Sequence, residues 1–354
     1  MDERATRPTL TAVARRAGVA ASTASLVFSG AGPVAAATRQ RVLAAAAELD
    51  YGGPDPLARS LRRGRSGVIG LVTEDTLAET FRDPVNLALL DGLGEELGDE
   101  RLGLLVIPMA GVGGPDPGDA ALDVAILIGC STSIAEPVAA LRRRSVPIIG
   151  VETEPFDGVA SIDIDNPEAT AAGARLLADL GHRRVAAVTL PLESSHRRGP
   201  LDADRERSAT TYVVRQRLAG LRTVFPAAGG VSAAASSVEE GMIAGRALLE
   251  VAPAARPTAI MAQSDLLAAG VVLAAEELGL RVPEDVSVVG FDGIALDGVL
   301  GRPLTTLVQP IAAKGRAAGR AVLAALRGET AAPTLLRCEL RRGATTGPVP
   351  AVRS

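Results

Sequence analysis

Residues 9–30 read TLTAVARRAGVAASTASLVFSG, and this order of helix formers, glycine and small residues decides the fold of the N-terminal part of the chain. Thr9 can cap a first helix over residues 10–17, and Gly18 supplies the sharp turn that ends it. A second short helix follows over residues 21–28. Two helices joined by a glycine turn, with small residues where they cross, pack tightly enough for the second to enter a DNA major groove.

A third helix is expected over residues 36–49. Helical periodicity places its apolar residues on one face, which packs on the first two helices. Those residues are Val42, Leu43, Ala46 and Leu49. In the second helix Ala24, Val27 and Phe28 recur at the same spacing, and Tyr51 closes the module. The sequence therefore predicts an all-α helix-turn-helix unit over residues 1–52.

Positive charge is concentrated at this end of the chain. Residues 1–65 hold ten arginines and five acids, whereas the other residues hold 27 basic and 36 acidic side chains. A basic module on an acidic body is expected when one part of a protein meets phosphates and the other does not. A small segment with much exposed surface can also be basic by chance. The charge alone therefore does not establish DNA binding, and the helix-turn-helix motif is needed as evidence.

Three consecutive segments resemble the start of the LacI family of bacterial transcription repressors, in the order and spacing of that family. They are residues 9–30 quoted above, VAAATRQRVLAAAAELDY over residues 34–51, and PDPLARSLRRGRSGVIGLV over residues 54–72. The resemblance implies that residues 21–28 form the recognition helix. The DNA contacts implied in this module are Thr9, Ala21, Ser22, Thr23, Ser25 and Leu26.

The sequence departs from the family pattern at two of these positions. Ala20 stands where the family usually has a capping serine, and Leu26 stands where many members have an arginine that bonds guanine. Ala21 and Leu26 can make apolar contact with a thymine methyl, and Ser22 can bond either kind of base. We expect few direct hydrogen bonds to bases, so more of the specificity rests on DNA shape.

Residues 53–66 are predicted to form a hinge. Pro54 and Pro56 break the preceding helix, and residues 57–63 can form about two helical turns, which are marginal alone in water. The resemblance implies that two copies of this segment fold together over the operator centre and wedge Leu61 into a minor-groove base step. Arg59 and Arg62 join Leu61 in the predicted DNA contacts. A solvated basic linker is the alternative.

From residue 67 the pattern changes to short apolar runs separated by amphipathic stretches. The runs are VIGLV (68–72), GLLVI (103–107), AILI (125–128), PIIG (147–150), VAAVT (185–189), TAIMA (258–262) and VSVVG (286–290). They are typical of parallel strands joined by crossover helices, the doubly wound α/β arrangement that binds ligands at the carboxyl ends of its strands. Seven such strands exceed one comfortable sheet, so we expect two lobes with a cleft between them.

Residues 161–188 and the stretch from Ala259 to Pro310 again resemble the LacI family, whose sensor shares its fold with periplasmic sugar-binding proteins. The predicted α/β domain covers residues 67–345, and residues 346–354 form a tail. We expect an N-terminal lobe of about 67–165 and 303–330, and a C-terminal lobe of about 166–302 and 331–345.

The resemblance carries ligand-binding roles to particular positions of the cleft. They are Asp292 of GFDG, Ser264 and Asp265 of AQSD, Asp165 and Asn166 of DIDN, and Arg217 of RLAGLR. Carboxylates that follow strands can accept hydrogen bonds from sugar hydroxyls, and an arginine supplies a fork of donors. An acid after a strand can instead cap the next helix. For Asp265 the capping role and the ligand-binding role are equally consistent with the sequence.

Two segments depart from the family pattern around the cleft. Residues 190–216 are longer and more charged than the usual connection, and Asp83, Val85 and Asn86 stand where an Asn-Pro-Phe-Phe run is common. With five phenylalanines, two tyrosines and no tryptophan, stacking partners for a sugar are scarce. Phe81 and Phe291 are the expected ones, with Tyr212 as a third.

The sequence offers no catalytic or metal-binding constellation. His182 and His196 lack cysteine, histidine or acid neighbours at ligand spacing. Ser194, Ser195 and His196 are adjacent in one loop, which does not place a nucleophile against its base. The glycines of AGVGGP over residues 110–115 lack the spacing of a nucleotide-binding loop. We expect no enzyme activity, no cofactor and no metal.

The prediction is a ligand-responsive repressor, a homodimer on a palindromic DNA operator, controlled by a small, sugar-like effector. The N-terminus lacks a secretory pattern and no apolar run is long enough for a membrane span, so a cytoplasmic protein without membrane contact is expected. Cys130 and Cys338 are expected to be reduced. One rival, a transporter's sugar-binding protein, would need a signal peptide. The other, an α/β enzyme, would need a catalytic cluster.

Overall fold

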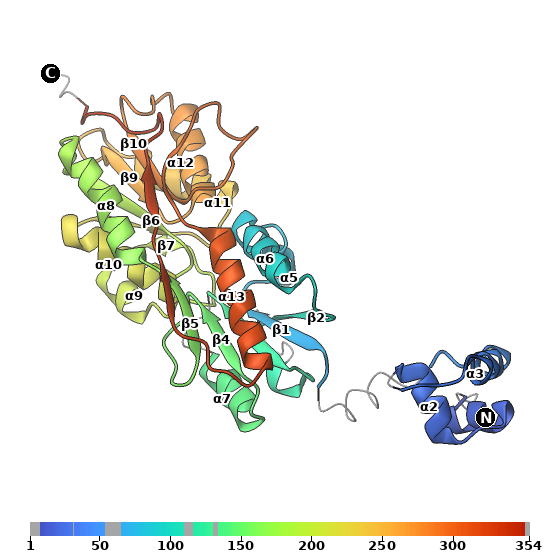
Figure 1. Cartoon of the computed structure of the whole chain (residues 1–354). Helices are drawn as coiled ribbons and strands as arrows, with labels where there is room; N and C mark the ends of the chain where they lie inside the picture. Colours follow the sequence, from blue (N-terminus) through green and yellow to red (C-terminus); the bar gives the residue numbers. More distant parts are fainter. Residues whose placement is uncertain (1–7, 31, 54–64, 110–115, 130–133, 351–354) are drawn as a thin grey trace, which may run out of the picture. The chain divides into compact units, whose positions relative to one another are not determined.

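The computed structural model describes residues 8–30, 32–53, 65–109, 116–129 and 134–350. The chain divides into two units, residues 1–67 and 68–354, and each is described by itself. Figure 1 shows the three helices of the first unit and the two sheets of the second. Within the described ranges, no helix is both long and apolar enough to cross a membrane.

The first unit is a three-helix module made of α1 (Leu10–Ala17), α2 (Ala21–Ser29) and α3 (Ala36–Glu48). The Thr9 side chain caps α1 by accepting from the Ala12 N–H at 3.2 Å, and Gly18 ends the helix with a φ of 64°. Its left-handed backbone favours glycine because a Cβ is strained there. The predicted helix-turn-helix is confirmed in its bounds and in its caps.

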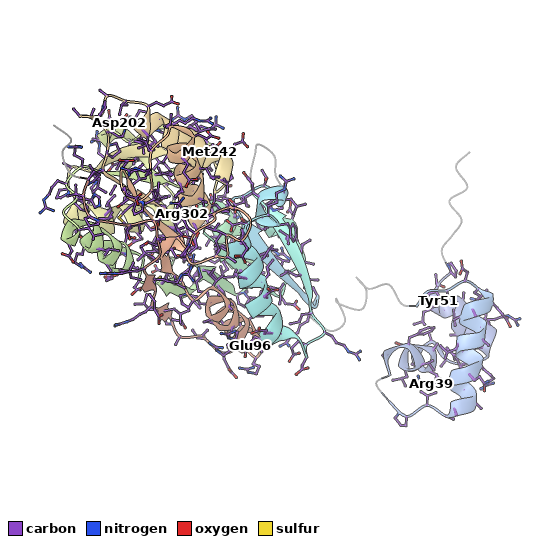
Figure 2. All side chains as sticks on the ribbon, turned by 90° about the horizontal axis from the view of Figure 1, so that it is seen from above. Arg39, Tyr51, Glu96, Asp202, Met242 and Arg302 are labelled. Carbon is purple, nitrogen blue, oxygen red and sulfur yellow. The ribbon has the colours of Figure 1, made fainter. Side chains whose placement is uncertain are left out.

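The core of this unit corrects one prediction. Val42, Ala45 and Ala46 of α3 are buried, whereas Leu43, which we expected to pack inside, is 48% exposed. Positions three and four apart share a helix face, and Leu43 lies one step off the face that includes Val42 and Ala46. Tyr51, labelled in Figure 2, closes the module as predicted. Its ring packs edge-on against the ring of Phe28, with 5.5 Å between the ring centroids.

The first lobe of the second unit is built on a six-stranded parallel sheet, in the order β12-β5-β4-β3-β1-β2. Its strands are β1 (Val68–Thr73), β2 (Gly103–Pro108), β3 (Val124–Ile128), β4 (Ile148–Val151), β5 (Ala160–Ile164) and β12 (Thr334–Leu336). Its helices are α5 (Leu77–Thr80), α6 (Pro84–Leu97), η1 (Pro117–Asp119), α7 (Ala135–Arg143) and α13 (Ile311–Leu326). Helices α6 and α13 cover one face, and α7 covers the other.

The second lobe has a seven-stranded sheet, in the order β13-β11-β10-β9-β6-β8-β7, with antiparallel strands at its edges. Its strands are β6 (Val185–Thr189), β7 (Gly199–Pro200), β8 (Gly229–Ser232), β9 (Ala259–Ala262), β10 (Ser287–Asp292), β11 (Thr305–Val308) and β13 (Glu339–Arg341). Its helices are α8 (Asn166–Asp179), α9 (Ala203–Ser208), α10 (Tyr212–Val224), α11 (Val238–Leu249) and α12 (Asp265–Glu277). Helices α8 and α10 cover one face, and α11 and α12 cover the other.

The chain passes between the two lobes several times. Its second and third passages lie further along the sequence than predicted. Strand β11 pairs with β10 of the second lobe, so the chain returns to the first lobe near residue 310 rather than 303. Strand β12 pairs with β5 of the first lobe, so the last crossing follows residue 336 rather than 330. These bounds depend on strand pairing, which the local apolar pattern does not show.

The predicted tail is also part of the second lobe over its described residues. The Gly347 N–H donates to Ser287 Oγ at 3.1 Å, and the Val349 N–H donates to the Leu180 carbonyl at 2.9 Å. Thr345 just before it is fully buried. Gly347 and Val349 are therefore hydrogen-bonded to the second lobe instead of extending away from it.

Helices α6 and α13 approach each other closely because glycines meet at their crossing. A Cβ on Gly92 would lie 2.1 Å from the Ala312 carbonyl oxygen, and a Cβ on Gly315 would lie 2.1 Å from that of Leu89. Both contacts are with backbone, which cannot move aside cheaply. At the surface beside this crossing, Arg320 pairs with Glu96, which is labelled in Figure 2, at 3.3 Å between Nη1 and Oε2. The close packing fixes the start of α13, which carries Lys314 into the site described next.

Candidate functional site

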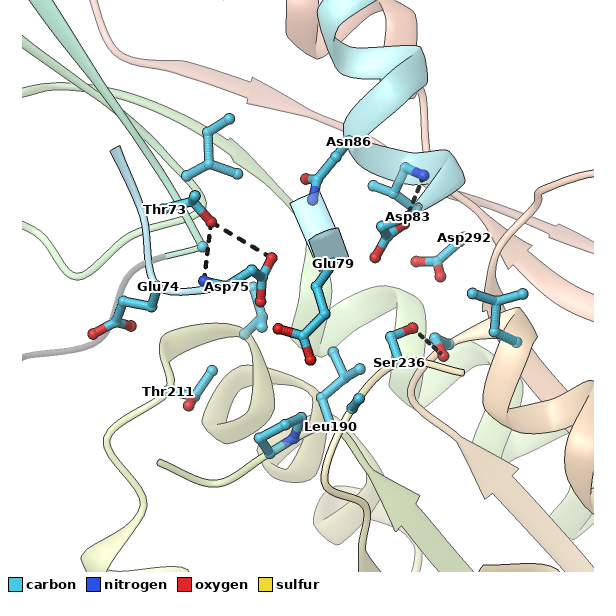
Figure 3. Close-up of a pocket in the computed structure, with 18 of the residues that line it drawn as sticks. Thr73, Glu74, Asp75, Glu79, Asp83, Asn86, Leu190, Thr211, Ser236 and Asp292 are labelled. Carbon is cyan, nitrogen blue, oxygen red and sulfur yellow. Dashed lines mark hydrogen bonds between the residues drawn. The ribbon is translucent and has the colours of Figure 1, made fainter. Parts of the chain in front are cut away.

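A cavity of about 540 Å³ lies between the two lobes, with walls from both. Parallel strands present their carboxyl ends on one edge of a sheet, and the two sheets face the cavity with those edges. Figure 3 shows Thr73 at the end of β1 and Asp292 at the end of β10 on its wall, with Asp75, Glu79 and Asp83 nearby. The predicted cleft is thus present, and its volume suits a ligand the size of a sugar.

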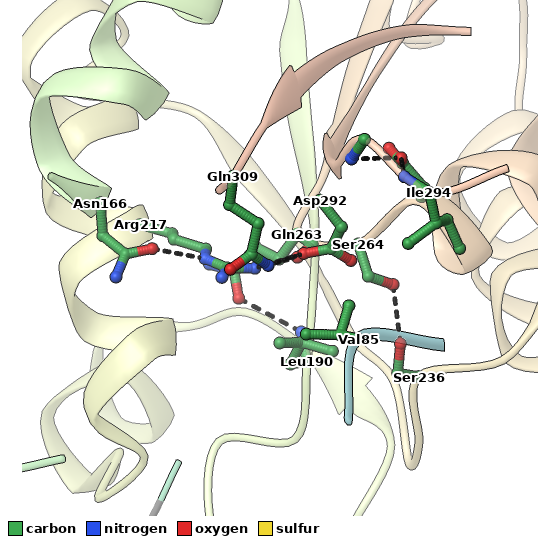
Figure 4. Close-up of polar contacts among 12 residues, drawn as sticks. Val85, Asn166, Leu190, Arg217, Ser236, Gln263, Ser264, Asp292, Ile294 and Gln309 are labelled. Carbon is green, nitrogen blue, oxygen red and sulfur yellow. Dashed lines mark hydrogen bonds and ion pairs between the residues drawn. The ribbon is translucent and has the colours of Figure 1, made fainter. Parts of the chain in front are cut away.

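Arg217, on α10, lies at the base of this cavity with 4% of its surface exposed. Its Nε donates to Asn166 Oδ1 at 2.8 Å, and its Nη1 donates to the Gln263 carbonyl oxygen (Figure 4). The guanidinium lies over the Phe291 ring, 3.6 Å from its centroid. An arginine held on three sides is pre-organised, so a ligand meets it without paying for its ordering.

Asp292 ends β10 and points into the cavity with a φ of 118°, an unusual backbone angle for a residue with a side chain. Its Oδ1 accepts from Gln309 Nε2 at 2.6 Å and lies 3.7 Å from Arg217 Nη1. Burial raises the pKa of this carboxyl well above its usual range, and Arg217 offsets only part of that effect. Backbone strain at a ligand-facing residue is typical of functional sites.

A buried ion pair between Lys314 and Glu152 lies at the floor of the cavity. Lys314 of α13, the only lysine in the sequence, donates to Glu152 after β4 and to Gln309. Glu152 also accepts from Asn166 Nδ2 at 2.9 Å. Burial would raise the pKa of Glu152, but Lys314 and Arg217 together lower it below its usual value. The carboxylate is therefore ionised and links residues of both lobes.

Three of the eight predicted ligand residues lie on the cavity wall, namely Arg217, Ser264 and Asp292. Ser264 also caps α12 by accepting from the Leu267 N–H at 3.2 Å, and the hydroxyl of Ser236 donates to it at 2.9 Å (Figure 4). Asn166 is fully buried behind Arg217 and positions its guanidinium. That these four side chains bind a ligand stays a prediction.

Asp265 and Asp165 do not line the cavity, which corrects both predictions. Asp265 is fully buried and accepts from the N–H groups of Gly293 at 2.7 Å and Ile294 at 3.0 Å. The helix cap is Ser264, so the capping alternative for Asp265 is wrong as well. Asp165 accepts from the Cys338 N–H at 2.8 Å and joins two of the crossings between the lobes. Each carboxylate is turned away by backbone donors that sequence spacing does not reveal.

The aromatic predictions are also corrected. Phe81 follows α5 and is 49% exposed outside the cavity wall, and Phe291 is 2% exposed beneath the Arg217 guanidinium. Tyr212, the first residue of α10, is partly buried against the core of the second lobe, and it is not among the lining residues either. Among the described residues that line the cavity, none is a phenylalanine, tyrosine or tryptophan. The described wall therefore offers charged groups and hydrogen-bonding groups, without the large rings that stack on a sugar.

Sequence reasoning missed several lining residues. They are Asp75, Glu79, Asp83, Glu152, Gln309 and Lys314. The isolated lysine in an arginine-rich sequence and the acid after β4 were signals that could have found two of them. The unusually long 190–216 connection also contributes to the wall through Leu190, Glu193, Ser194 and His196. His196 Nδ1 donates to the Ala234 carbonyl oxygen at 2.9 Å, which holds this segment to the lobe.

Helix α2 presents a solvent-facing side that matches the predicted base contacts. Ala21, Ser22 and Leu26 are exposed, whereas Thr23 and Ser25 are half-buried. Ala20 makes no side-chain cap, as the departure from the family pattern predicts. Thr9 is exposed at the start of α1. Arg59, Leu61 and Arg62 of the predicted hinge lie outside the described residues.

The histidines have structural partners. His182 is fully buried, with Nδ1 3.0 Å from Thr258 Oγ1 and Nε2 3.1 Å from the Gly347 carbonyl oxygen. Burial lowers the pKa of His182, which keeps the ring neutral in this network. In the described ranges, no three histidine, cysteine or acidic side chains gather closely enough to hold a metal ion.

Comparison with known proteins agrees with both units. Residues 9–53 match the model of the bacterial regulatory proteins of the lacI family, and residues 174–346 match a periplasmic binding protein-like domain. An HTH-type transcriptional regulator of Mycobacterium tuberculosis is 33% identical over 303 residues, which cover 82% of this chain and 83% of that protein. The regulator CelR of Thermobifida fusca is 31% identical, with 95% and 97% covered.

Solved structures share the whole fold. The lac repressor dimer bound to operator and an anti-inducer is 25% identical and has a TM-score of 0.72, covering 97% of this chain and all of that one. A CelR–cellobiose complex is 24% identical with a TM-score of 0.64, covering 96% of this chain and all of that one. These relatives are transcription regulators rather than enzymes. The chain belongs to the LacI family of bacterial regulatory proteins, DNA-binding transcription regulators that respond to small molecules.

Proposed function

We propose that this regulator is a repressor that binds a two-fold-symmetric operator as a homodimer and that a sugar or sugar derivative in the cavity controls it. The single observation that carries this proposal is the cavity itself, whose walls come from both lobes. A ligand that contacts both walls favours one relative pose of the lobes over another, and this differential affinity is what shifts a conformational equilibrium.

The exposed side of α2 supports operator reading. Ala21 and Leu26 offer apolar contacts to thymine methyls, and Ser22 offers one hydroxyl to base edges. Such a surface gives modest direct discrimination, so the hinge and DNA shape have to add to it. By the family resemblance, Leu61 supplies a minor-groove wedge flanked by Arg59 and Arg62.

An exposed apolar surface on the first lobe supports the homodimer. Its members are exposed side chains of α5, the residue after α5, α6 and the edge strand β2, elements that stand on one side of the lobe in Figure 1, and they are Leu77, Phe81, Leu87, Leu104 and Leu105. Exposed large apolar side chains on neighbouring elements are typical of an interface. A two-fold dimer would also present two copies of α2 to the two halves of an operator.

The dimer is tested by sedimentation of two matched variants. Leu105→Arg places a charge on edge strand β2, where Leu105 is 42% exposed, and should give a folded monomer. Leu335→Arg places the same charge on β12 at the other edge of the same sheet, where Leu335 is 67% exposed, and should stay dimeric. If both variants sediment like the parent, β2 is not the interface.

The sugar proposal is supported by the cavity's polar wall and by one structural relative, which holds cellobiose. Arg217 and Asp292 offer the donor and acceptor that a polyol needs. Action on chromosomal DNA would place the protein in the cytoplasm. A transporter's sugar-binding protein shares the cavity but has no use for the exposed α2 surface.

Selection of DNA from a random library with the full-length protein tests the whole proposal. We expect a near-palindromic site and loss of binding when the effector, found by thermal shift against a sugar library, is added. Enhanced binding on effector addition would make the protein a co-repressor-dependent regulator. Leu61→Ala should weaken the selected site far more than random DNA at the same salt concentration, and an equal loss on both would exclude the wedge.

A further inference from the structure

The wall of the cavity carries many more acids than bases. Eight carboxyl groups line it among the described residues, namely Glu74, Asp75, Glu79, Asp83, Glu152, Glu193, Glu239 and Asp292. The permanent cations on the same wall are Arg82, Arg217 and Lys314. Figure 3 shows four of the acids, Asp75, Glu79, Asp83 and Asp292, arranged around the same space.

The two buried cations are already occupied by protein groups. Lys314 donates to Glu152 and Gln309, and Arg217 donates to Asn166 and the Gln263 carbonyl oxygen. Arg217 also has the carboxylates of Glu152 and Asp292 at 3.8 Å and 3.7 Å. These cations therefore balance the floor of the cavity and leave its upper wall acidic.

Asp75 and Asp83 of the upper wall form no ion pair with any residue that the structure describes. Asp83 accepts a hydrogen bond from the Val85 N–H at 2.8 Å at the start of α6. Asp75 accepts one from the Thr73 hydroxyl at 3.5 Å. Both are half-buried, and burial raises the pKa of each. Lys314 and Arg217 offset only part of the effect of burial at Asp83, and the neighbouring acids Asp83 and Glu79 add to it at Asp75. A ligand that brings a cation next to these carboxylates favours their charged form.

Two further observations narrow the ligand to an organic cation. The acids are spread around the cavity, and in the described ranges no three of them gather closely enough for a metal ion. The described wall also lacks the phenylalanine, tyrosine or tryptophan side chains that usually stack on a neutral sugar ring. An ammonium group has three donors and no acceptor, which matches a wall that offers mainly acceptors.

We propose that the effector is an amine-bearing sugar or polyol whose ammonium group is held by Asp75 and Asp83 while its hydroxyls reach Asp292 and Arg217. The inference rests on the proposed effector function of the cavity and adds the charge of the ligand to it. The ligand thus joins Asp75 and Asp83, which lie just before α5 and α6 of the first lobe, to α10 and β10 of the second.

The test uses matched sugars with the full-length protein in thermal shift and calorimetry. For each of several rings, the probe is the free amine, its N-acetyl form and the neutral parent, for example D-glucosamine, N-acetyl-D-glucosamine and D-glucose. We expect at least one amine to bind at least about tenfold more tightly than both counterparts, because a charged hydrogen bond to a half-buried carboxylate exceeds a neutral one by that much.

Substitutions separate a direct contact from a general attraction. Asp83→Asn removes the charge but keeps the helix cap, since asparagine caps as well as aspartate, and should lower amine affinity at least about tenfold. Asp91→Asn removes an exposed acid on the same helix α6 and should leave the affinity unchanged. Asp75→Asn provides a second removal of charge from the wall should Asp83→Asn fold poorly.

Several outcomes overturn the inference. Equal affinity for an amine and its N-acetyl or neutral form would show that the sensor works without reading charge, so the proposed function would stand and the cation would not. Binding of uronic acids or sugar phosphates instead would show that Arg82 dominates the wall. Stabilisation by no amine in the panel counts against the inference, and stabilisation by no sugar at all counts against the proposed function too.

Discussion

The guanidinium of Arg217, on α10 of the second lobe, lies 3.8 Å from the carboxylate of Glu152, which follows β4 in the first lobe. Glu152 is joined from its own lobe by Lys314 and from the second lobe by Asn166. All these side chains are nearly or fully buried. The lobes therefore share a compensated set of buried charges directly beneath the cavity, and anything that changes the balance changes both lobes.

The first prediction concerns that balance. Glu152→Gln keeps the shape of the side chain but leaves Lys314 and Arg217 without their shared carboxylate, so the free energy of unfolding should fall by about 3–5 kcal/mol. Urea unfolding at neutral pH measures it. Glu277→Gln, which breaks an exposed pair with Arg246, is the control and should cost less than about 1 kcal/mol. Comparable losses in the two variants would contradict the buried-charge account.

The ionisation of Glu152 also predicts how acid affects the stability of the protein. The pKa of Glu152 is lowered in the folded state, so its contribution is present above the ordinary value of 4.5 and is lost as the pH falls through the folded value. The stability difference between the parent and Glu152→Gln should therefore shrink below about pH 4.5. Urea midpoints of both proteins from pH 7 down to pH 3 measure this, and a constant difference would argue against ionisation of Glu152.

Asp163, on β5, is expected to act in the opposite sense. Burial first and then the nearby Glu152 raise its pKa to about 6 from 3.8, and one of its carboxylate oxygens has no hydrogen-bond partner among the described atoms. The folded state then holds the proton more tightly than the unfolded state, so stability is lost as the pH rises from about 4 through about 6. Asp163→Asn should match the parent near pH 4 and exceed it above pH 6.5. Parallel stability curves across this range would show that Asp163 is ionised throughout.

The effector response should depend on Asp292. Asp292→Asn removes a carboxyl group whose charged form burial disfavours, while an amide oxygen can still accept from Gln309. We expect the melting temperature without ligand to hold or rise, operator binding to persist, and the ligand-induced thermal shift to disappear. Asp297→Asn, an exposed acid of the loop that follows, should keep the full shift. An unaltered shift in Asp292→Asn would remove Asp292 from the ligand contacts.

The sequence predicts the headpiece better than the cavity, for a physical reason. Thr9 and Gly18 end α1 through contacts within a few residues, so their pattern is local and readable. Lys314 and Glu152 are 162 residues apart, and only the approach of α13 to β4 brings them together. Ser264 follows β9 and Asp292 ends β10, so their positions at the carboxyl ends of strands favoured them as cavity residues.

Asp265 and strand β11 show where the local sequence pattern no longer determines the structure. Asp265 follows a strand as Asp292 nearly does, but Thr306 of β11 and the turn at Gly293 draw its carboxylate away from the cavity. Strand β11 itself pairs with β10, which moved the predicted lobe boundary. Both facts depend on tertiary pairing, which a single sequence does not encode at any one position.

The last prediction tests the base-reading surface with two exposed leucines of the same headpiece. Leu26 on α2 is 38% exposed and Leu43 on α3 is 48% exposed, so removing either side chain disturbs the core little. If Leu26 packs on a thymine methyl, Leu26→Ala loses up to three buried carbons at about 0.8 kcal/mol each, which weakens the selected operator at least about tenfold. Random DNA should be bound as before at the same salt, because phosphate contacts carry that affinity. Leu43→Ala should leave both affinities unchanged. Gel shifts with both DNAs at one salt concentration decide the matter: an equal loss in the two variants would indicate damage to the headpiece, and a loss for Leu26→Ala on random DNA as well would place Leu26 against the backbone instead of a base.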